Sequence, residues 1–156
     1  RSGSLSGADA PGDEISTVNP PGVVSTFGTL PFTSSPTGLA FDGSGNLYAA
    51  EGSKNLVTKI TPAGTKSVFA SGVAAPQGLA FDTGGNFYAA NTDFNRVSMI
   101  APDGTVSIFA TGITSPAFIA MVPEPSACAL LAMAGAGLAA CRFRRSCEIV
   151  TVTFGG

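Results

Sequence analysis

The chain has 156 residues, with 20 Gly and 11 Pro, and its formal net charge at pH 7 is −2. That length suffices for one modest domain, and the near-neutral charge gives no electrostatic basis for nucleic-acid binding. A count of 0 His and 3 Cys fits neither a zinc site nor a disulfide framework. Glycine and proline recur at regular places, which indicates turns between short strands.

A repeat organises the body of the chain. The stretch "SPTGLAFDGSGNLYAAEGSKNLVTKITPAGTKSVFASGVAA" from Ser35 is matched by "APQGLAFDTGGNFYAANTDFNRVSMIAPDGTVSIFATGITS" from Ala75, an offset of 75 − 35 = 40 residues. A weaker copy begins at Ile15, before these two units, and a further copy begins at Pro116, after them. We therefore expect most of one unit, two whole units and the first residues of a fourth.

Each unit predicts four short strands. In the first whole unit the predicted strands are 38–42, 46–51, 56–61 and 65–71. The sequences "DGSG", "GSKN" and "PAG" lie between them and supply Gly, Asn and Asp where the backbone must reverse tightly. Four antiparallel strands in ~40 residues are typical of one blade of a β-propeller.

The pattern Pro-x-Gly-Leu-Ala-Phe-Asp, then Gly-Asn-Leu/Phe-Tyr-Ala-Ala, Asn-x-Val and Pro-x-Gly-Thr resembles NHL repeats, over residues 4–120. It is also similar to six-bladed propellers of the gluconolactonase and streptogramin-lyase kind. The resemblance implies an all-β fold, an incomplete NHL-type propeller of about three four-stranded blades, over residues 1–121. Because a ring needs ~4–8 blades, we expect the others upstream of Arg1, with assembly of several chains or a truncated relic as alternatives.

The acidic residues of the body favour structural roles. Asp42, Asp82 and Asp103 precede or occupy turns, where aspartate caps its own backbone. Glu51 and Asn91 are repeat-equivalent and form a candidate ligand rim, although two oxygen donors fall short of the ~6–8 that Ca²⁺ takes. The enzymes that this repeat resembles use metal ligands or general bases, often His, and this sequence contains 0 His. We therefore expect no enzyme activity, no metal and no cofactor.

An uncharged segment follows the last repeat, from Ser126 to Cys141, which is 141 − 125 = 16 residues. A helix of that length would measure ~24 Å, somewhat short of the ~30 Å hydrocarbon core. Three arginines come directly after it: Arg142, Arg144 and Arg145. Basic residues after an apolar span stay on the cytoplasmic side, so we predict one C-terminal transmembrane helix with the propeller outside. A buried helix of a soluble domain is the alternative.

The tripeptide Pro123-Glu124-Pro125 directly precedes this apolar segment. Both prolines disfavour helix, so the tripeptide is predicted to be extended and accessible. Its order with the apolar segment and the arginines resembles the PEP-CTERM sorting signal, here over 122–145. The resemblance implies recognition by an exosortase of a Gram-negative bacterium, cleavage near the tripeptide, and transfer to the cell surface or extracellular matrix.

The stretch "SCEIVTVTFGG", residues 146–156, continues where such signals usually end. We treat it as a tail, with disorder, a frameshifted end or a non-native extension as the expectations. Taken together, the sequence predicts an exported, surface-sorted binding or structural module whose polysaccharide or protein ligand is not identified. The alternatives are a lactonase- or lyase-like enzyme with catalytic residues upstream, and a degenerate fragment without function.

Overall fold

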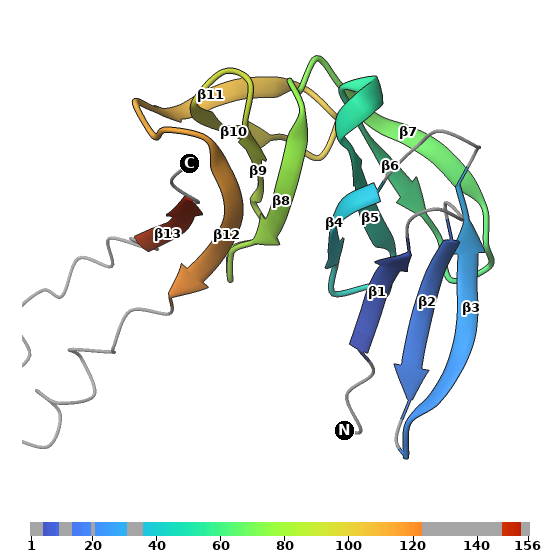
Figure 1. Ribbon diagram of the computed structural model, residues 1–156. Coiled ribbons are helices and arrows are strands. Elements are labelled where there is room, and N and C mark those ends of the chain that lie inside the picture. Colours follow the sequence, from blue (N-terminus) through green and yellow to red (C-terminus); the bar gives the residue numbers. More distant parts are fainter. Residues whose placement is uncertain (1–4, 10–13, 20, 31–35, 123–147, 154–156) are drawn as a thin grey trace, which may run out of the picture.

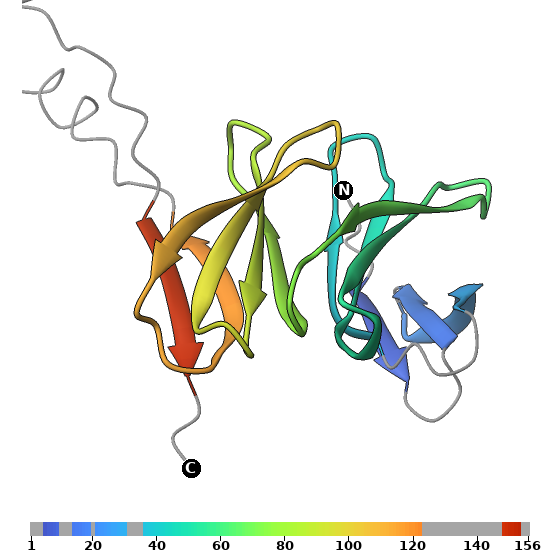
Figure 2. The same ribbon diagram turned by 90° about the horizontal axis from the view of Figure 1, so that it is seen from above.

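The computed structural model describes residues 5–9, 14–19, 21–30, 36–122 and 148–153. In this part of the chain, antiparallel sheets stand side by side in an arc (Figure 1). Figure 2 shows the same arrangement from above, with each sheet as one blade of the array. The fold is therefore all-β and propeller-like, as the repeat predicts.

Two complete sheets form the middle of the array, and we call them blades B and C. Blade B contains β4 (Pro36–Phe41), β5 (Leu47–Glu51), β6 (Leu56–Ile60) and β7 (Lys66–Ser71). Blade C contains β8 (Pro76–Phe81), β9 (Phe87–Asn91), β10 (Arg96–Ile100) and β11 (Val106–Thr111). The strands of each blade pair in chain order. All predicted strands of blade B are confirmed to within about two residues, the ordinary uncertainty of an element boundary.

A short sheet lies at each end of the array. Blade A contains β1 (Leu5–Asp9), β2 (Glu14–Asn19) and β3 (Val23–Thr29), which is the predicted incomplete first unit. Blade D contains β12 (Pro116–Val122) and β13 (Glu148–Thr153). β12 is the predicted start of a fourth unit.

Strand β13 departs from the sequence-based expectation. We expected residues 146–156 to be a tail, with disorder as one option, whereas Glu148–Thr153 form a strand paired antiparallel with β12. The physical reason is the sequence "EIVTVT", a run of β-branched residues with high strand propensity. Without a neighbouring strand on this side, β12 would leave backbone N–H and C=O groups unpaired. Pairing with β13 satisfies them.

The glycine of the Pro-x-Gly motif is required by close packing of the innermost strands. β4 contacts β8, and β8 contacts β12. A Cβ at Gly38 would lie 1.8 Å from the carbonyl oxygen of Gln77, and one at Gly78 would lie 2.8 Å from that of Ala117. Phe118 occupies the corresponding position of β12 and is 51% exposed. A further inner strand therefore could not pack on β12 as closely as β8 packs on β4.

The core lies between neighbouring blades. Leu47 and Ala49 of β5 pack toward blade A with Ile15, and Tyr48 packs toward blade C with Phe87. β5 is buried on both faces, which explains its nearly continuous apolar sequence "LYAA". The rings between blades B and C pack edge-on, tilted or stacked, with centroid distances from 4.2 Å to 5.9 Å among Tyr48, Phe69, Phe81 and Phe87.

The loop from the second to the third strand is alike in both complete blades. The 3-10 turn η1 (Gly52–Lys54) leads to Asn55, whose φ of 58° is left-handed; Asn95 has a φ of 49°. The side-chain oxygen of Asn55 accepts a hydrogen bond from the N–H of Ala75 at 2.8 Å, and Asn95 holds Ser115 in the same way. Asparagine tolerates this backbone conformation better than most residues, so the repeated Asn joins one blade to the next.

Candidate functional site

One aspartate holds the first turn of each complete blade. Asp42 Oδ1 accepts hydrogen bonds from the backbone N–H groups of Ser44 and Asn46, both at 2.9 Å. Its Oδ2 accepts from Asn46 Nδ2 at 2.7 Å and from the Tyr48 hydroxyl at 3.2 Å. Asp82 repeats this network in blade C with Gly84, Asn86 and Tyr88.

These networks set the charge state of the turns. Partial desolvation raises the pKa of Asp42, but the hydrogen bonds from Asn46, Ser44 and Tyr48 together outweigh it and hold the pKa below its ordinary value of 3.8. The pKa of Asp82 is lowered in the same way. At Asp103, the backbone N–H of Thr105 lowers the pKa of the carboxyl. The predicted role of these aspartates as turn caps is confirmed.

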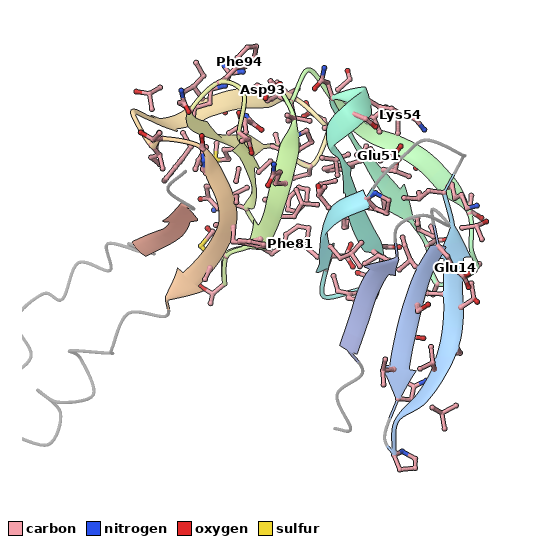
Figure 3. The ribbon with its side chains drawn as sticks, viewed as in Figure 1. Glu14, Glu51, Lys54, Phe81, Asp93 and Phe94 are labelled. Atoms are coloured by element: carbon pink, nitrogen blue, oxygen red, sulfur yellow. The ribbon has the colours of Figure 1, made fainter. Side chains whose placement is uncertain are left out.

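Glu51 lies at the end of β5 and is only 2% exposed. The hydroxyl of Thr58 donates to Glu51 Oε1, and Lys54 Nζ lies 3.2 Å from Glu51 Oε2 (Figure 3). Glu51 and Lys54 line a hollow of about 240 Å³. Its other lining residues are Leu56, Thr58, Lys66, Ser67 and Val68. The carboxylate is thus anchored inside blade B, with its cationic partner at the edge of the hollow.

Asn91 is the equivalent residue of blade C and is fully buried. Its Nδ2 donates to the hydroxyl of Ser98. Asn91 Oδ1 and Arg96 Nε are buried and have no hydrogen-bond partner among the described residues, although the two residues face each other across the β9–β10 ladder. The Arg96 guanidinium instead lies 4.6 Å from the ring centroid of Phe94.

The structure places Glu51 and Asn91 at equivalent strand ends, as the repeat predicts. Their partners differ, since Thr58 and Lys54 bind the first and Ser98 binds the second. Each set belongs to its own blade, so the two residues form separate buried sites. Their role as a ligand rim stays a prediction. Among the residues that the structure describes, no group of His, Cys, Asp and Glu is placed to hold a metal ion.

A hollow lies between blades B and C, and it was not predicted from the sequence. It has a volume of about 470 Å³, and its lining includes Asp42, Tyr48, Lys59, Phe81 and Asp82. Lys59 Nζ lies 5.6 Å from the ring centroid of Tyr48, and burial raises the pKa of the Tyr48 phenol. The hollow depends on the packing of two blades, and the only sequence signal for it is that aromatic positions recur at the repeat offset.

The sorting residues lie outside the described part of the chain. This holds for Pro123, Glu124, Pro125 and the arginines Arg142, Arg144 and Arg145. The predicted transmembrane segment 126–141 lies there too; within the described ranges no helix has the length and apolar character to cross a membrane. Residues 122–145 match the family described as the PEP-CTERM protein-sorting motif.

Solved structures resemble the blades. The virginiamycin B lyase from Staphylococcus aureus is similar over 76% of this chain and 42% of that one, with 21% identity and a TM-score of 0.64. A chain of the nidogen/laminin complex matches over 74% of this chain and 48% of its own length, with 20% identity and a TM-score of 0.65. A protein of unknown function from Bacteroides thetaiotaomicron matches over 74% and 38%, with 19% identity and a TM-score of 0.63.

These likenesses define the class of protein. The chain spans less than half the length of each of these structures, and at such identities the similarity concerns the fold. The fold is a partial β-propeller. The chain joins this partial propeller to a PEP-CTERM sorting motif, which implies export and processing by an exosortase. No curated protein matches it.

Proposed function

We propose that this protein is anchored transiently in the inner membrane by residues 126–141 and cleaved by an exosortase near Pro123-Glu124-Pro125. The propeller body is then held at the surface or in the extracellular matrix of a Gram-negative bacterium, where it acts as a binding or structural module. The observation that carries this proposal is the sorting motif at 122–145, which begins at the last residue of β12.

The position of the motif also supports a direction for binding. β12 ends at Val122, at the same end of the array as Phe81, the last residue of β8 (Figure 3). Glu51, Lys54 and Phe94 lie at the opposite end (Figure 3). Phe94 is 57% exposed there. We assign this opposite end, which faces away from the membrane anchor, to the contact with a surface polysaccharide or protein.

The body acts as a binder and not as an enzyme in this proposal. Support comes from Asp42 and Asp82, whose carboxylate oxygens already accept hydrogen bonds within their turns. Glu51 is likewise engaged by Thr58 and Lys54. A general base must reach its substrate, and each of these carboxylates makes structural contacts within its own blade.

The second candidate is a propeller enzyme whose catalytic residues lie upstream of residue 1. Its support is the similarity of fold to a virginiamycin B lyase. Incubation of the full exported protein with virginiamycin B, followed by chromatography, discriminates the two candidates. Loss of the intact antibiotic would favour the enzyme, and full recovery would favour the binding module.

A variant of the tripeptide tests the sorting step. Glu124→Ala should leave the chain at full length in the inner membrane, because the exosortase no longer recognises the motif. The matched control is Glu14→Ala, which removes a glutamate of β2 and should be processed as the wild type is. Normal delivery of the Glu124→Ala protein to the surface would overturn the sorting proposal.

A further inference from the structure

Strand β13 takes the place of the second strand of a fourth blade. In blade B, Pro36 pairs with Glu51 and the register shifts before Gly38; in blade D, Pro116 pairs with Thr153 and the register shifts before Phe118. Ala40 pairs with Tyr48, and its equivalent Ala120 pairs with Val150. The ladder of blade D thus reproduces the first hairpin of a blade, with residues 123–147 where blade B has its short turn.

This pairing fixes where both ends of the sorting segment lie. Val122 pairs with Glu148, so the Cα atoms on either side of the segment are roughly 4.5–5.5 Å apart. One membrane crossing would separate its ends by the ~30 Å of the hydrocarbon core. Two crossings by helices would need ~40 residues, whereas the segment has 147 − 122 = 25.

We infer that β12–β13 pairing and membrane anchoring are alternative topologies of the same chain, an inference that rests on the proposed sorting function. In one topology residues 126–141 span the membrane, the segment 148–153 stays on the arginine side, and an exosortase can act. In the other the whole C-terminal region is translocated, β13 completes the first hairpin of blade D, and the motif is not presented for cleavage.

The two topologies compete for the same residues. Six positions are paired along the β12–β13 ladder, and the strand sequence is rich in β-branched residues. An open β12 edge favours such pairing. Two features oppose this pairing. The apolar stretch 126–141 favours the membrane, and the arginines that follow it resist translocation. Weakening β13 should therefore shift chains from the translocated to the anchored form.

Native Cys147 reports the topology, because it directly precedes β13. In a full-length chain carrying Cys128→Ala and Cys141→Ala, a membrane-impermeant maleimide added to spheroplasts should label Cys147 only in translocated molecules. A labelled wild-type fraction is expected. Val150→Pro, which breaks the ladder, should abolish that labelling and raise the processed fraction. The control Val150→Thr keeps a β-branched residue and should behave as the wild type.

A cross-strand disulfide makes the opposite change. Ala120→Cys with Val150→Cys joins two positions that the ladder pairs, and their Cα separation suits a disulfide. With the three native cysteines replaced by Ala, the oxidised protein should remain uncleaved, and growth with a reductant that prevents the disulfide from forming should restore cleavage. A complete absence of Cys147 labelling in the wild-type background, or cleavage of the cross-linked protein at the wild-type rate, would overturn the inference.

The same samples separate this inference from the sorting proposal. The Glu124→Ala variant in the single-cysteine background should lose cleavage but keep the wild-type fraction of labelled Cys147. If that variant is cleaved normally, the sorting proposal fails. If it stays uncleaved while labelling does not respond to Val150→Pro, the sorting proposal stands and the alternative topologies are overturned.

Discussion

Blades B and C are copies of one repeat that agree at one end and differ at the other. At the end of the first turns, Asp42 and Asp82 make the same hydrogen bonds to equivalent partners. At the opposite end, blade B has an ion pair of the buried Glu51 with Lys54, whereas blade C has Asn91 and a buried Arg96 Nε that finds no hydrogen-bond partner among the described residues.

The difference separates what the fold requires from what the repeat can vary. The first turn must reverse the chain within about five residues, and a charged cap stabilises that reversal in every complete blade. The opposite end only needs a loop that tolerates a left-handed Asn. We therefore expect substitutions in the core and turns to affect both blades alike, and substitutions at the varied end to affect them differently.

The largest effect is expected in the core between the blades. Phe87→Ala should lower the free energy of unfolding by about 3–5 kcal/mol, because Phe87 is buried and stacks on Phe81 at 4.2 Å. The equivalent change in blade B, Leu47→Ala, should cost less, since it removes a smaller side chain that has no ring to stack. Urea denaturation of the purified protein measures both, and a smaller loss for Phe87→Ala would contradict this account of the core.

The turns should give equal effects in the two blades. Asp42→Ala and Asp82→Ala should each cost roughly 1–2 kcal/mol, because each leaves backbone donors of a turn without an acceptor. Since both folded-state pKa values lie below 3.8, this stabilisation is present above about pH 4 and is lost as the pH falls through the lowered values. Denaturation curves between neutral pH and pH 3 test it: the wild type should lose more stability on acidification than the double Asn variant.

The varied end should give effects of opposite sign. Glu51→Gln should destabilise the protein by about 1 kcal/mol, because the charge that Lys54 and Thr58 hold is removed. Asn91→Asp should stabilise it by a few tenths to about 1 kcal/mol, because it offers Arg96 Nε a charged acceptor across the ladder. Thermal unfolding of the two variants compares them directly, and a loss of stability in Asn91→Asp would refute the pairing with Arg96.

The smallest change in stability is expected at the exposed rim. Phe94→Ala should alter the free energy of unfolding by less than about 0.5 kcal/mol, because its ring is mostly exposed. It should nevertheless reduce cosedimentation with exopolysaccharide purified from the host. Val24→Ala, a similarly exposed apolar residue on strand β3 of blade A, serves as the control. Equal cosedimentation of the two variants would remove the rim from the proposed binding surface.

Much of the fold could be predicted because the same pattern of strands and turns occurs in two complete repeat units. The strand boundaries of blade B followed from Gly, Asn and Asp turns, and the capping role of Asp42 followed from its place before such a turn. β13 could not be predicted, because it pairs with β12 across 25 intervening residues that form no part of the repeat. The partners of Glu51 were also missed, since Thr58 reaches it only after the β5–β6 hairpin has formed.

The central claim is that the sorting motif delivers this propeller to the cell surface by cleavage. The most direct measurement is the intact mass and C-terminal peptide of the protein recovered from the surface or matrix fraction. The account predicts a chain that ends near Pro123-Glu124-Pro125, with residues 126–156 absent. Surface or matrix protein made up entirely of chains that retain the sequence through Gly156 would contradict it.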